Sequence, residues 1–129
     1  RSAMAAALEQ AGLQPAQIDY INLHGTGTPS NDSAESCAVT ALFAAATPCS
    51  STKGATGHTL GAAGALEAVI SALALRAGLM PGGLNTRRVD PALPLNYLTA
   101  NRRARLTRVL SNSFGFGGAN CVLLFGRTG

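Results

Sequence analysis

The order of apolar and polar positions predicts two helices and two strands in the first part of the chain. They run in the order helix 2–12, strand 19–23, helix 32–45 and strand 48–52, the second strand having the weaker propensity. Gly12 marks the end of the first helix, and Ser30 or Asn31 can cap the second. Asp32 and Glu35 stand in the first turn of that second helix, where a negative charge complements the helix dipole.

A third helix is predicted over residues 59–77, with Gly78 at its end. It is apolar on every face except at Glu67, Ser71 and the terminal Arg76. A helix that is apolar all round is normally buried, so we expect a buried helix here. The apolar run is too short to cross a membrane comfortably and contains a carboxylate, so no membrane span is expected.

Residues 79–106 are rich in turn residues and predict a long irregular crossover over the surface. Residues 107–112 and 119–125 then predict two strands, joined by the glycine-rich stretch 113–118. The whole order predicts an α/β domain, with a right-handed parallel unit followed by a strand pair.

Two loops should meet in this topology. His24 follows the first strand, and the loop from Lys53 to His58 follows the second. The carboxyl ends of parallel strands lie at one edge of the sheet, which is where α/β proteins place their ligands. We therefore expect both loops to line one crevice.

Composition narrows the possible classes of function. The 129 residues suit one domain, and the net charge of +4 comes from arginines spread along the chain. The densest cluster, Arg102, Arg103, Arg105 and Arg108, has few aromatic neighbours and no nucleic-acid motif, so we interpret it as a solvated face.

The three cysteines, Cys37, Cys49 and Cys121, stand in apolar surroundings without metal-ligand spacing and indicate buried thiols in a reducing cytoplasm. The chain opens on Arg1, inside a helical pattern and without an initiator Met. We expect it to be a piece of a longer protein.

Lys53 is the only lysine, and His24 and His58 are the only histidines. Two neutral imidazoles at one sheet edge could both donate Nε2–H to one enolate or oxyanion. We expect burial and the start of a helix to disfavour the charged form of His58. The alternative is that His58 only caps the helix by bonding the backbone.

Glu67 would be costly inside a buried apolar helix unless it is paired or protonated. Lys53 is the one lysine available as a partner, and Arg76 lies nine positions further on. A pair between Lys53 and Glu67 requires the loop to fold back alongside the helix. On one continuous helix, His58 and Glu67 would lie on opposite faces.

Two other stretches could contact a substrate. Thr26 and Thr28 offer hydroxyls that suit an extended amide and equally suit the local backbone. The stretch 114–118 alternates Phe114 and Phe116 with glycines, and a Phe held between glycines suits a gate with an oxyanion-binding N–H as well as a plain hairpin turn. The glycine loops match neither a dinucleotide fingerprint nor a P-loop, which argues against a nucleotide-binding domain.

Three motifs together closely resemble the β-ketoacyl-[acyl-carrier-protein] synthases, condensing enzymes of the thiolase fold. They are His24-Gly-Thr-Gly-Thr28-Pro-Ser-Asn-Asp32, the stretch from Ser51-Thr-Lys53 to Gly-Ala-x-Glu67, and Ser111-Asn-Ser-Phe-Gly-Phe116-Gly-Gly-Ala-Asn120. They occur in the family's order, and the resemblance covers essentially the whole chain. The sequence of the Lys53 loop is more similar to that of the elongating synthases of dissociated fatty-acid systems than to that of polyketide synthase modules.

The resemblance implies a role for each candidate residue. His24 and His58 would stabilise the enolate formed when a malonyl thioester loses CO₂, with Lys53 and Glu67 ordering the site. Thr26 and Thr28 would bind the phosphopantetheine arm of an acyl carrier protein, while Phe116, next to Phe114, would gate the acyl pocket and lend its N–H to the oxyanion hole. In some relatives a monovalent cation lies near the positions of Asn22, Glu67 and Ser111; no other metal and no cofactor of the protein's own are implied.

The chain also departs from the family pattern. The acylated cysteine of the family lies in a first half that this sequence does not contain, and none of the three cysteines stands in such a place. The chain would be the C-terminal half of a thiolase-like fold, a mixed sheet with packed helices, without its opening strand. The resemblance suggests that this strand would lie next to residues 19–23. Alone, the chain should neither accept an acyl group nor bury its sheet fully.

We therefore expect part of a cytoplasmic 3-oxoacyl-[acyl-carrier-protein] synthase that acts on an acyl carrier protein and forms a homodimer, or a heterodimer with a related subunit. The alternative is a non-catalytic partner similar to a chain length factor. The presence of both His24 and His58 argues against that alternative.

Overall fold

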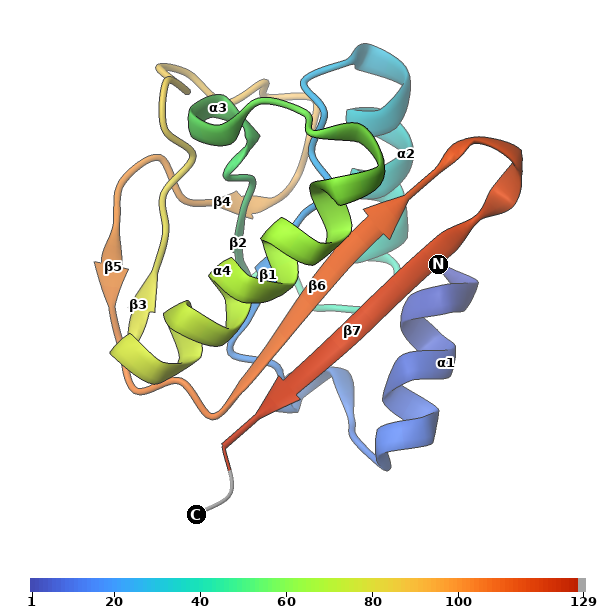
Figure 1. Ribbon diagram of the computed structural model, residues 1–129, viewed down its shortest axis with the longest axis vertical. Helices are drawn as coiled ribbons and strands as arrows, with labels where there is room; N and C mark the ends of the chain where they lie inside the picture. The colour runs from blue at the N-terminus through green and yellow to red at the C-terminus, as the bar shows by residue number, and fades with distance from the viewer. Residues whose placement is uncertain (128–129) are drawn as a thin grey trace.

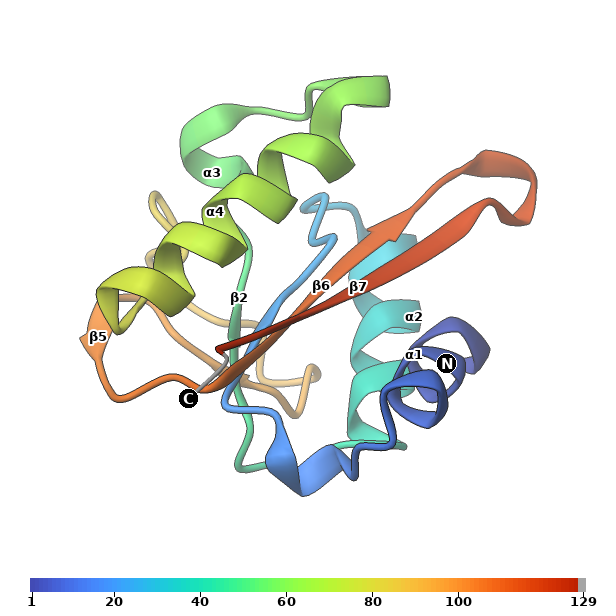
Figure 2. The same ribbon diagram turned by 60° about the horizontal axis from the view of Figure 1, so that its bottom comes forward.

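The computed structural model describes residues 1–127, which form a five-stranded mixed sheet with helices on both faces. In chain order the elements are α1 (Ser2–Ala11), β1 (Tyr20–Asn22), α2 (Pro29–Thr40), β2 (Pro48–Ser50), α3 (Lys53–Thr56), α4 (Ala63–Ala77), β3 (Leu79–Met80), β4 (Asn96–Tyr97), β5 (Arg102–Arg103), β6 (Arg108–Phe114) and β7 (Asn120–Gly126). Short 3₁₀ turns lie at Pro15–Gln17, Leu60–Ala62 and Phe116–Gly118. Helices α1 and α2 cover one face of the sheet, and α4 covers the other (Figures 1 and 2).

The strand order in the sheet is β4-β2-β1-β6-β7. The first four strands are parallel, and β7 returns antiparallel to β6 as a hairpin. The expected parallel unit followed by a strand pair is therefore confirmed. Asn22 is aligned with Ser50 on β2 and with Ser111 on β6, so these three polar residues lie side by side across the sheet.

The position expected for the missing opening strand, next to residues 19–23, is wrong. Strand β1 has β2 on one side and β6 on the other, so no place beside residues 19–23 is free. Among the described strands of this sheet, the outer edges belong to β4 and β7.

The ends of the helices follow from local backbone chemistry. Gly12 and Gly78 end α1 and α4 in the left-handed conformation, with φ of 63° and 60°, as expected. Helix α2 begins earlier than expected, because Pro29 occupies its first turn and Thr28, not Ser30 or Asn31, is the extended N-cap residue. It also ends earlier, at Thr40, and the chain then turns so that Phe43 enters the core.

The crossover 79–106 is more ordered than its composition indicates. Strands β3 and β5 pair antiparallel in a small second sheet, and β4 joins the edge of the main sheet beside β2. Each of the three strands has only two residues, too few for a visible periodicity. The arginines of β5 are exposed, which agrees with the expected solvated face.

The core has one apolar cluster on each face of the sheet. On the face of α1 and α2, Ile21, Leu23 and Leu110 pack with residues of the helices. On the α4 face, Tyr20 and Val109 pack with Leu75 and its neighbours. The alternation along β1 therefore directs Tyr20 and Asn22 towards α4, and Ile21 away from it.

The prediction that the third helix is buried on every face is wrong. Its buried side carries Glu67 and Ser71 together with Ala63, Ala74 and Leu75. The opposite side is apolar and exposed: Val69 is 57% and Leu73 46% accessible. The side that faces the sheet thus mixes apolar residues with two polar ones, and an apolar stripe faces outward.

By length and composition alone, the segment Leu60–Ala77 could cross a membrane. The same test is passed by core helices, and this segment packs against β6 and β7 with Glu67 on its inner side. The helix is therefore weak evidence for a membrane span.

The two sides of α4 should differ in their effect on stability. We expect Leu75→Ala to lower the free energy of unfolding of the 129-residue chain by about 2–4 kcal/mol, because it opens a cavity in the core. Leu73→Ala, two positions away and exposed, is the matched control and should cost less than about 1 kcal/mol. Urea unfolding measures both; equal losses would show that the outer stripe is covered in solution.

Candidate active site

The candidate residues meet at the carboxyl end of the parallel strands. His24 lies two residues beyond β1, and Lys53 begins α3 just after β2. Strands β1 and β2 are parallel neighbours, so their ends bring these two side chains together. The expectation that both loops line one crevice is confirmed.

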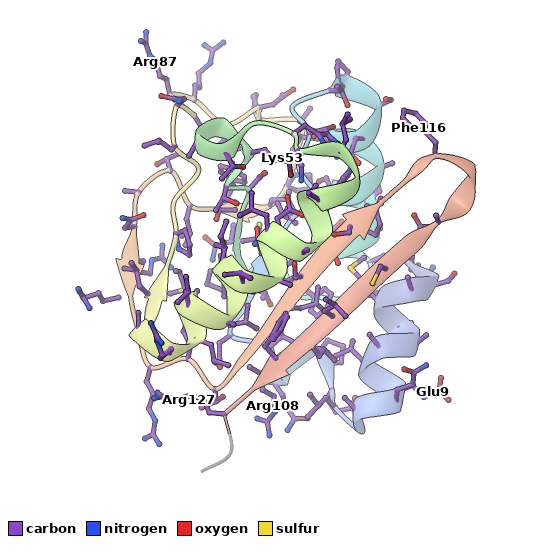
Figure 3. All side chains as sticks on the ribbon, viewed as in Figure 1. Glu9, Lys53, Arg87, Arg108, Phe116 and Arg127 are labelled. Atoms are coloured by element: carbon purple, nitrogen blue, oxygen red, sulfur yellow. The ribbon has the colours of Figure 1, made fainter. Side chains whose placement is uncertain are left out.

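Lys53 and Glu67 form a buried ion pair. Lys53 begins α3 (Figure 3), and its ammonium donates to Glu67 Oε1 on α4. The two side chains are only 6% and 2% exposed. Burial raises the pKa of Glu67, and the hydrogen bond and charge of Lys53 oppose that rise only in part. The pairing expected from the lone lysine is therefore confirmed.

The Lys53 ammonium also holds the His24 segment. It donates to the carbonyl oxygen of His24 at 2.5 Å and lies 3.5 Å from His24 Nδ1. An ammonium can only donate, so Nδ1 is the acceptor and the proton of the neutral ring is on Nε2. Burial, helped by the charges of Lys53 and His58, lowers the pKa of His24 to about 4. His24 is therefore neutral at physiological pH.

The two imidazoles are adjacent, with ring centroids 5.4 Å apart and planes at 87°. His58 Nδ1 accepts the N–H of Leu60 at 3.1 Å, so a neutral His58 also carries its proton on Nε2. The backbone bond of the capping alternative and the pairing with His24 thus coexist. The expected burial of His58 is wrong, because the side chain is exposed.

His58 does not lie on α4 at all. The helix begins at Ala63, and Leu60, in the preceding turn, has a positive φ of 53°. The expected opposition of His58 and Glu67 on one continuous helix therefore does not apply. The break in the helix is what allows His58 to reach His24.

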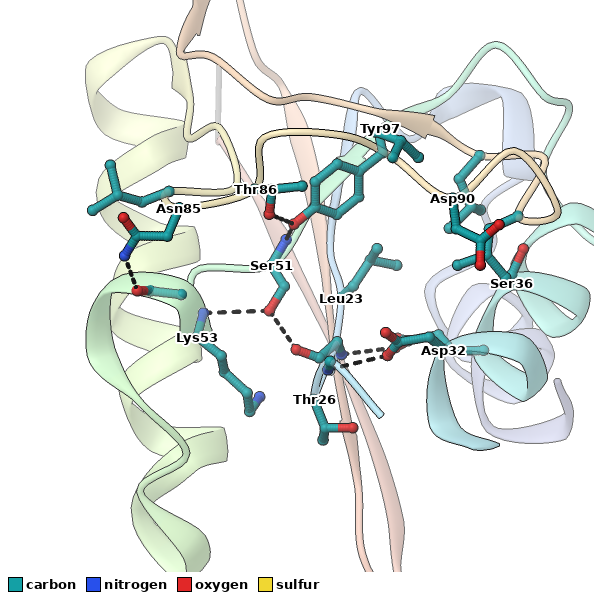
Figure 4. A pocket seen from close by; sticks show the side chains of 18 of the residues that line it. Leu23, Thr26, Asp32, Ser36, Ser51, Lys53, Asn85, Thr86, Asp90 and Tyr97 are labelled. Atoms are coloured by element: carbon teal, nitrogen blue, oxygen red, sulfur yellow. Dashed lines mark hydrogen bonds between the residues drawn. The ribbon is translucent and has the colours of Figure 1, made fainter. Parts of the chain in front are cut away.

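Thr26 and Thr28 lie on the loop after His24, and their hydroxyls bond each other at 2.8 Å. Thr26 lines a cavity of about 450 Å³ together with Lys53, His58, Ser51 and the segment 84–97 (Figure 4). The loop comes close to Ser51 because Gly25 has no side chain: a Cβ there would lie 2.4 Å from Ser51 Cβ.

The two phenylalanines of the glycine-rich hairpin differ in position. Phe114, at the end of β6, has its ring 5.8 Å from that of His24. Phe116 is fully exposed at the tip of the hairpin and is not part of the group formed by His24, His58 and Phe114 (Figure 3). The structure therefore brings Phe114, and not Phe116, against the imidazole of His24.

Two buried oxygen atoms without hydrogen-bond partners, on Asn22 and Glu67, are suited to a monovalent cation. Asn22 Nδ2 donates to Ser71 Oγ and to the Glu67 carbonyl, which leaves Asn22 Oδ1 buried without a partner. Glu67 Oε2 is likewise buried and unpartnered. Ser111 is aligned with Asn22 on the adjacent strand. These hard ligands fit an alkali cation; within residues 1–127, no cluster of His, Cys, Asp or Glu suits a transition metal.

The expectation of buried thiols is wrong for two of the three cysteines. Cys37 is on α2 and Cys121 on β7, both exposed, and Cys49 is buried in β2. Burial raises the pKa of Cys49 to about 12, which disfavours its thiolate.

Sequence reasoning missed two buried residues at the site. Glu35 was expected only to complement the dipole of its helix, and Asn112 was given no role. Glu35 accepts hydrogen bonds from the N–H groups of His24 and Gly25, and from Asn112 Nδ2. Nothing in the one-dimensional pattern marks a carboxylate that reaches back across a loop to a strand.

Comparison with known proteins shows the family. Residues 1–87 match the family described as "Beta-ketoacyl synthase, C-terminal domain". The chain belongs to the beta-ketoacyl synthase family. The fold is correspondingly that of the C-terminal part of a thiolase-like ketosynthase, as the resemblance implied.

Several relatives resemble this ketosynthase chain along nearly all of its length. The mitochondrial 3-oxoacyl-[acyl-carrier-protein] synthase of Arabidopsis thaliana is 47% identical over 95% of the chain, which spans 28% of that protein. Synthase 2 of Coxiella burnetii is 45% identical over 93% of the chain, which spans 30% of it. A ketosynthase solved in complex with its chain length factor, from Xenorhabdus doucetiae, is 50% identical with a TM-score of 0.91, over 98% of this chain and 32% of that one. The chain thus spans about a third or less of its relatives.

The ion pair gives a prediction on stability. We expect Glu67→Gln to lower the free energy of unfolding by about 3–5 kcal/mol, because it leaves the Lys53 ammonium buried without its counter-charge. The double variant Lys53→Met/Glu67→Leu removes both charges and should cost less than the sum of the single changes. Urea unfolding measures all of them. An unshifted midpoint for Glu67→Gln would mean that Glu67 is neither buried nor paired.

The depressed pKa of His24 gives a prediction on pH. As pH falls below 6.5, the unfolded chain binds a proton at His24, whereas the folded chain remains neutral there until about pH 4. His24 should therefore lower the stability progressively between those two values. Long-range ¹H–¹⁵N NMR should show Nε2–H on His24 and no titration above pH 5. The variant His24→Gln assigns the signal, and a midpoint near 6.5 would contradict the prediction.

Proposed function

We propose that this chain is the C-terminal part of a 3-oxoacyl-[acyl-carrier-protein] synthase that condenses a malonyl-carrier thioester with an enzyme-bound acyl chain. The observation that carries the proposal is the pair of adjacent imidazoles, His24 and His58, each with Nδ1 occupied by a local contact. Two Nε2–H donors in one place fit an oxygen on which negative charge develops. The names of the relatives support the same general class of reaction.

The proposed chemistry begins with decarboxylation. The bond between the malonyl carboxylate and Cα breaks, CO₂ leaves, and the electron pair passes into an enolate. Its oxygen accepts Nε2–H from His24, which is neutral, and from His58. The enolate carbon then attacks the carbonyl of the acyl thioester, a new carbon–carbon bond forms, and a thiolate leaves. That thiolate would be a cysteine in the rest of the protein.

Lys53 and Glu67 have a supporting role in this scheme. The ammonium holds the His24 carbonyl, and its charge adds to the effect of burial in lowering the pKa of His24. Glu67 balances that charge in the interior. If a monovalent cation binds, Asn22 Oδ1, Glu67 Oε2 and Ser111 would hold it, and it would supply positive charge next to the carboxylate.

The substrate arm is proposed to enter along the threonine loop. Thr26 and Thr28 would bond the amides of the carrier's phosphopantetheine, and the exposure of their segment supports this. Phe116 would gate the acyl pocket and Phe114 would line it. The glycines with positive φ at 117 and 118 give the Phe116 loop the backbone freedom that a gate requires.

The partner and the location remain part of the proposal. We propose an acyl carrier protein as the substrate carrier and a homodimer of the complete protein, in the cytoplasm and in fatty-acid or related biosynthesis. The alternative is a non-catalytic subunit similar to a chain length factor, since a related ketosynthase was solved together with one. The juxtaposed histidines favour the catalytic member, because a partner without chemistry has no need of two imidazoles aimed at one place.

The proposal predicts a selective loss of activity. In the complete protein, His24→Ala or His58→Ala should reduce malonyl-carrier decarboxylation by about 100-fold or more, because one donor to the enolate is lost. Acylation of the nucleophile should persist in both variants. Release of ¹⁴CO₂ and intact-mass analysis measure the two steps.

Two outcomes would contradict the proposal. Unchanged decarboxylation in either variant would exclude the enolate-donor role. The 129-residue chain serves as a further control: with an acyl-carrier thioester it should gain no stable adduct, and a single adduct on Cys37, Cys49 or Cys121 would show that the nucleophile lies in this chain.

A further inference from the structure

The main chain of His24 lies between two buried charges of opposite sign. On its N–H side, Glu35 Oε1 accepts the His24 amide at 2.8 Å. On its carbonyl side, the ammonium of Lys53 donates to the His24 oxygen. Bonds to ionised groups are about twice as strong as neutral ones, so both ends of this residue are firmly held.

Glu35 is arranged as a clamp. Its side chain reaches from α2 across the loop, and its second oxygen accepts the N–H of Gly25 at 2.8 Å. One carboxylate thus fixes two successive amides where β1 ends and the loop begins. Glu35 is only 3% exposed, so water does not compete for these bonds.

The clamp is itself anchored from β6. Asn112, with no exposed surface, donates Nδ2 to Glu35 Oε1 at 3.0 Å, and Asn31 contributes a longer bond of 3.4 Å to Oε2. Each carboxylate oxygen therefore has two donors. Burial raises the pKa of Glu35, and these donors favour its charged form.

A carboxylate is required by this arrangement, and an amide of equal size is not equivalent. In the variant Glu35→Gln, one of the two terminal side-chain atoms would be a donor instead of an acceptor. Whichever way the amide turns, either the N–H of His24 or that of Gly25 would then face another N–H. The substitution therefore breaks one half of the clamp almost without changing volume.

We propose that Glu35, anchored by Asn112, is a positioning residue that fixes the His24 main chain and thereby directs its Nε2–H at the enolate. The inference rests on the proposed function, because it assigns the clamp a purpose in decarboxylation. Glu35 contacts no reacting atom. It acts only through the position of His24, and misplacing a catalytic group by about 1 Å can cost on the order of 100-fold in rate.

The experiment compares two steps in the complete protein that carries this chain. Glu35→Gln should lower kcat for malonyl-carrier decarboxylation by about 10- to 100-fold, with KM for the carrier thioester changed less than about threefold. Acylation of the nucleophile, which does not need the enolate donor, should stay near the wild-type rate. Glu9→Gln on α1, exposed and outside the site, is the matched control and should change neither step.

Asn112→Ser keeps the carboxylate on both amides and removes its anchor, together with a weaker contact of Asn112 Nδ2 to Met4 Sδ. It should show the same selective loss of decarboxylation, by up to about tenfold. It replaces Glu35→Gln as the test variant if Glu35→Gln does not fold. Assays are run well below the melting temperature of each variant. Parallel losses of acylation and decarboxylation would mean a merely structural role and overturn the proposal, as would a folded Glu35→Gln protein with full decarboxylation. No decarboxylation by the wild type would instead refute the proposed function.

Discussion

The buried ammonium of Lys53 is the constraint on which the arrangement of the site depends. A charge in the interior is tolerated only when it is paired and its donors are used, and Lys53 satisfies this with Glu67 and the His24 carbonyl. To do so it must draw the end of β2, the end of β1 and the middle of α4 to one point. The positions of three elements are thereby fixed by one side chain.

The same requirement explains the unusual orientation of α4. Glu67 and Ser71 face the sheet because Lys53 and Asn22 are there to bond them. Some apolar residues of the helix are then left outside, as the exposure of Val69 and Leu73 shows, while Leu75 stays in the core. Burying two polar side chains of a helix at the sheet while exposing an apolar stripe is unfavourable for an isolated domain. It is consistent with a chain that spans about a third or less of each relative.

Charges alternate through the site from α2 to α4. The Glu35 carboxylate, the His24 peptide, the Lys53 ammonium and the Glu67 carboxylate follow one another in space. His24 is the neutral member between them, and burial together with the charge of Lys53 lowers its pKa. The imidazole can therefore serve as a hydrogen-bond donor at neutral pH without becoming a cation, which is the state that stabilising an enolate requires.

The sequence by itself determined the order of elements, the strand-end placement of His24 and Lys53, and the need of Glu67 for a charged partner. Glycine signals, periodicity and the cost of a buried carboxylate are local or nearly local properties. Only the tertiary structure decided that His58 is exposed and precedes α4, that Phe114 instead of Phe116 meets His24, and that Glu35 clamps the loop from behind. These depend on how a helix breaks and which way a side chain points across a gap. Such outcomes are set by packing between distant segments, and the order of residues along the chain does not contain them.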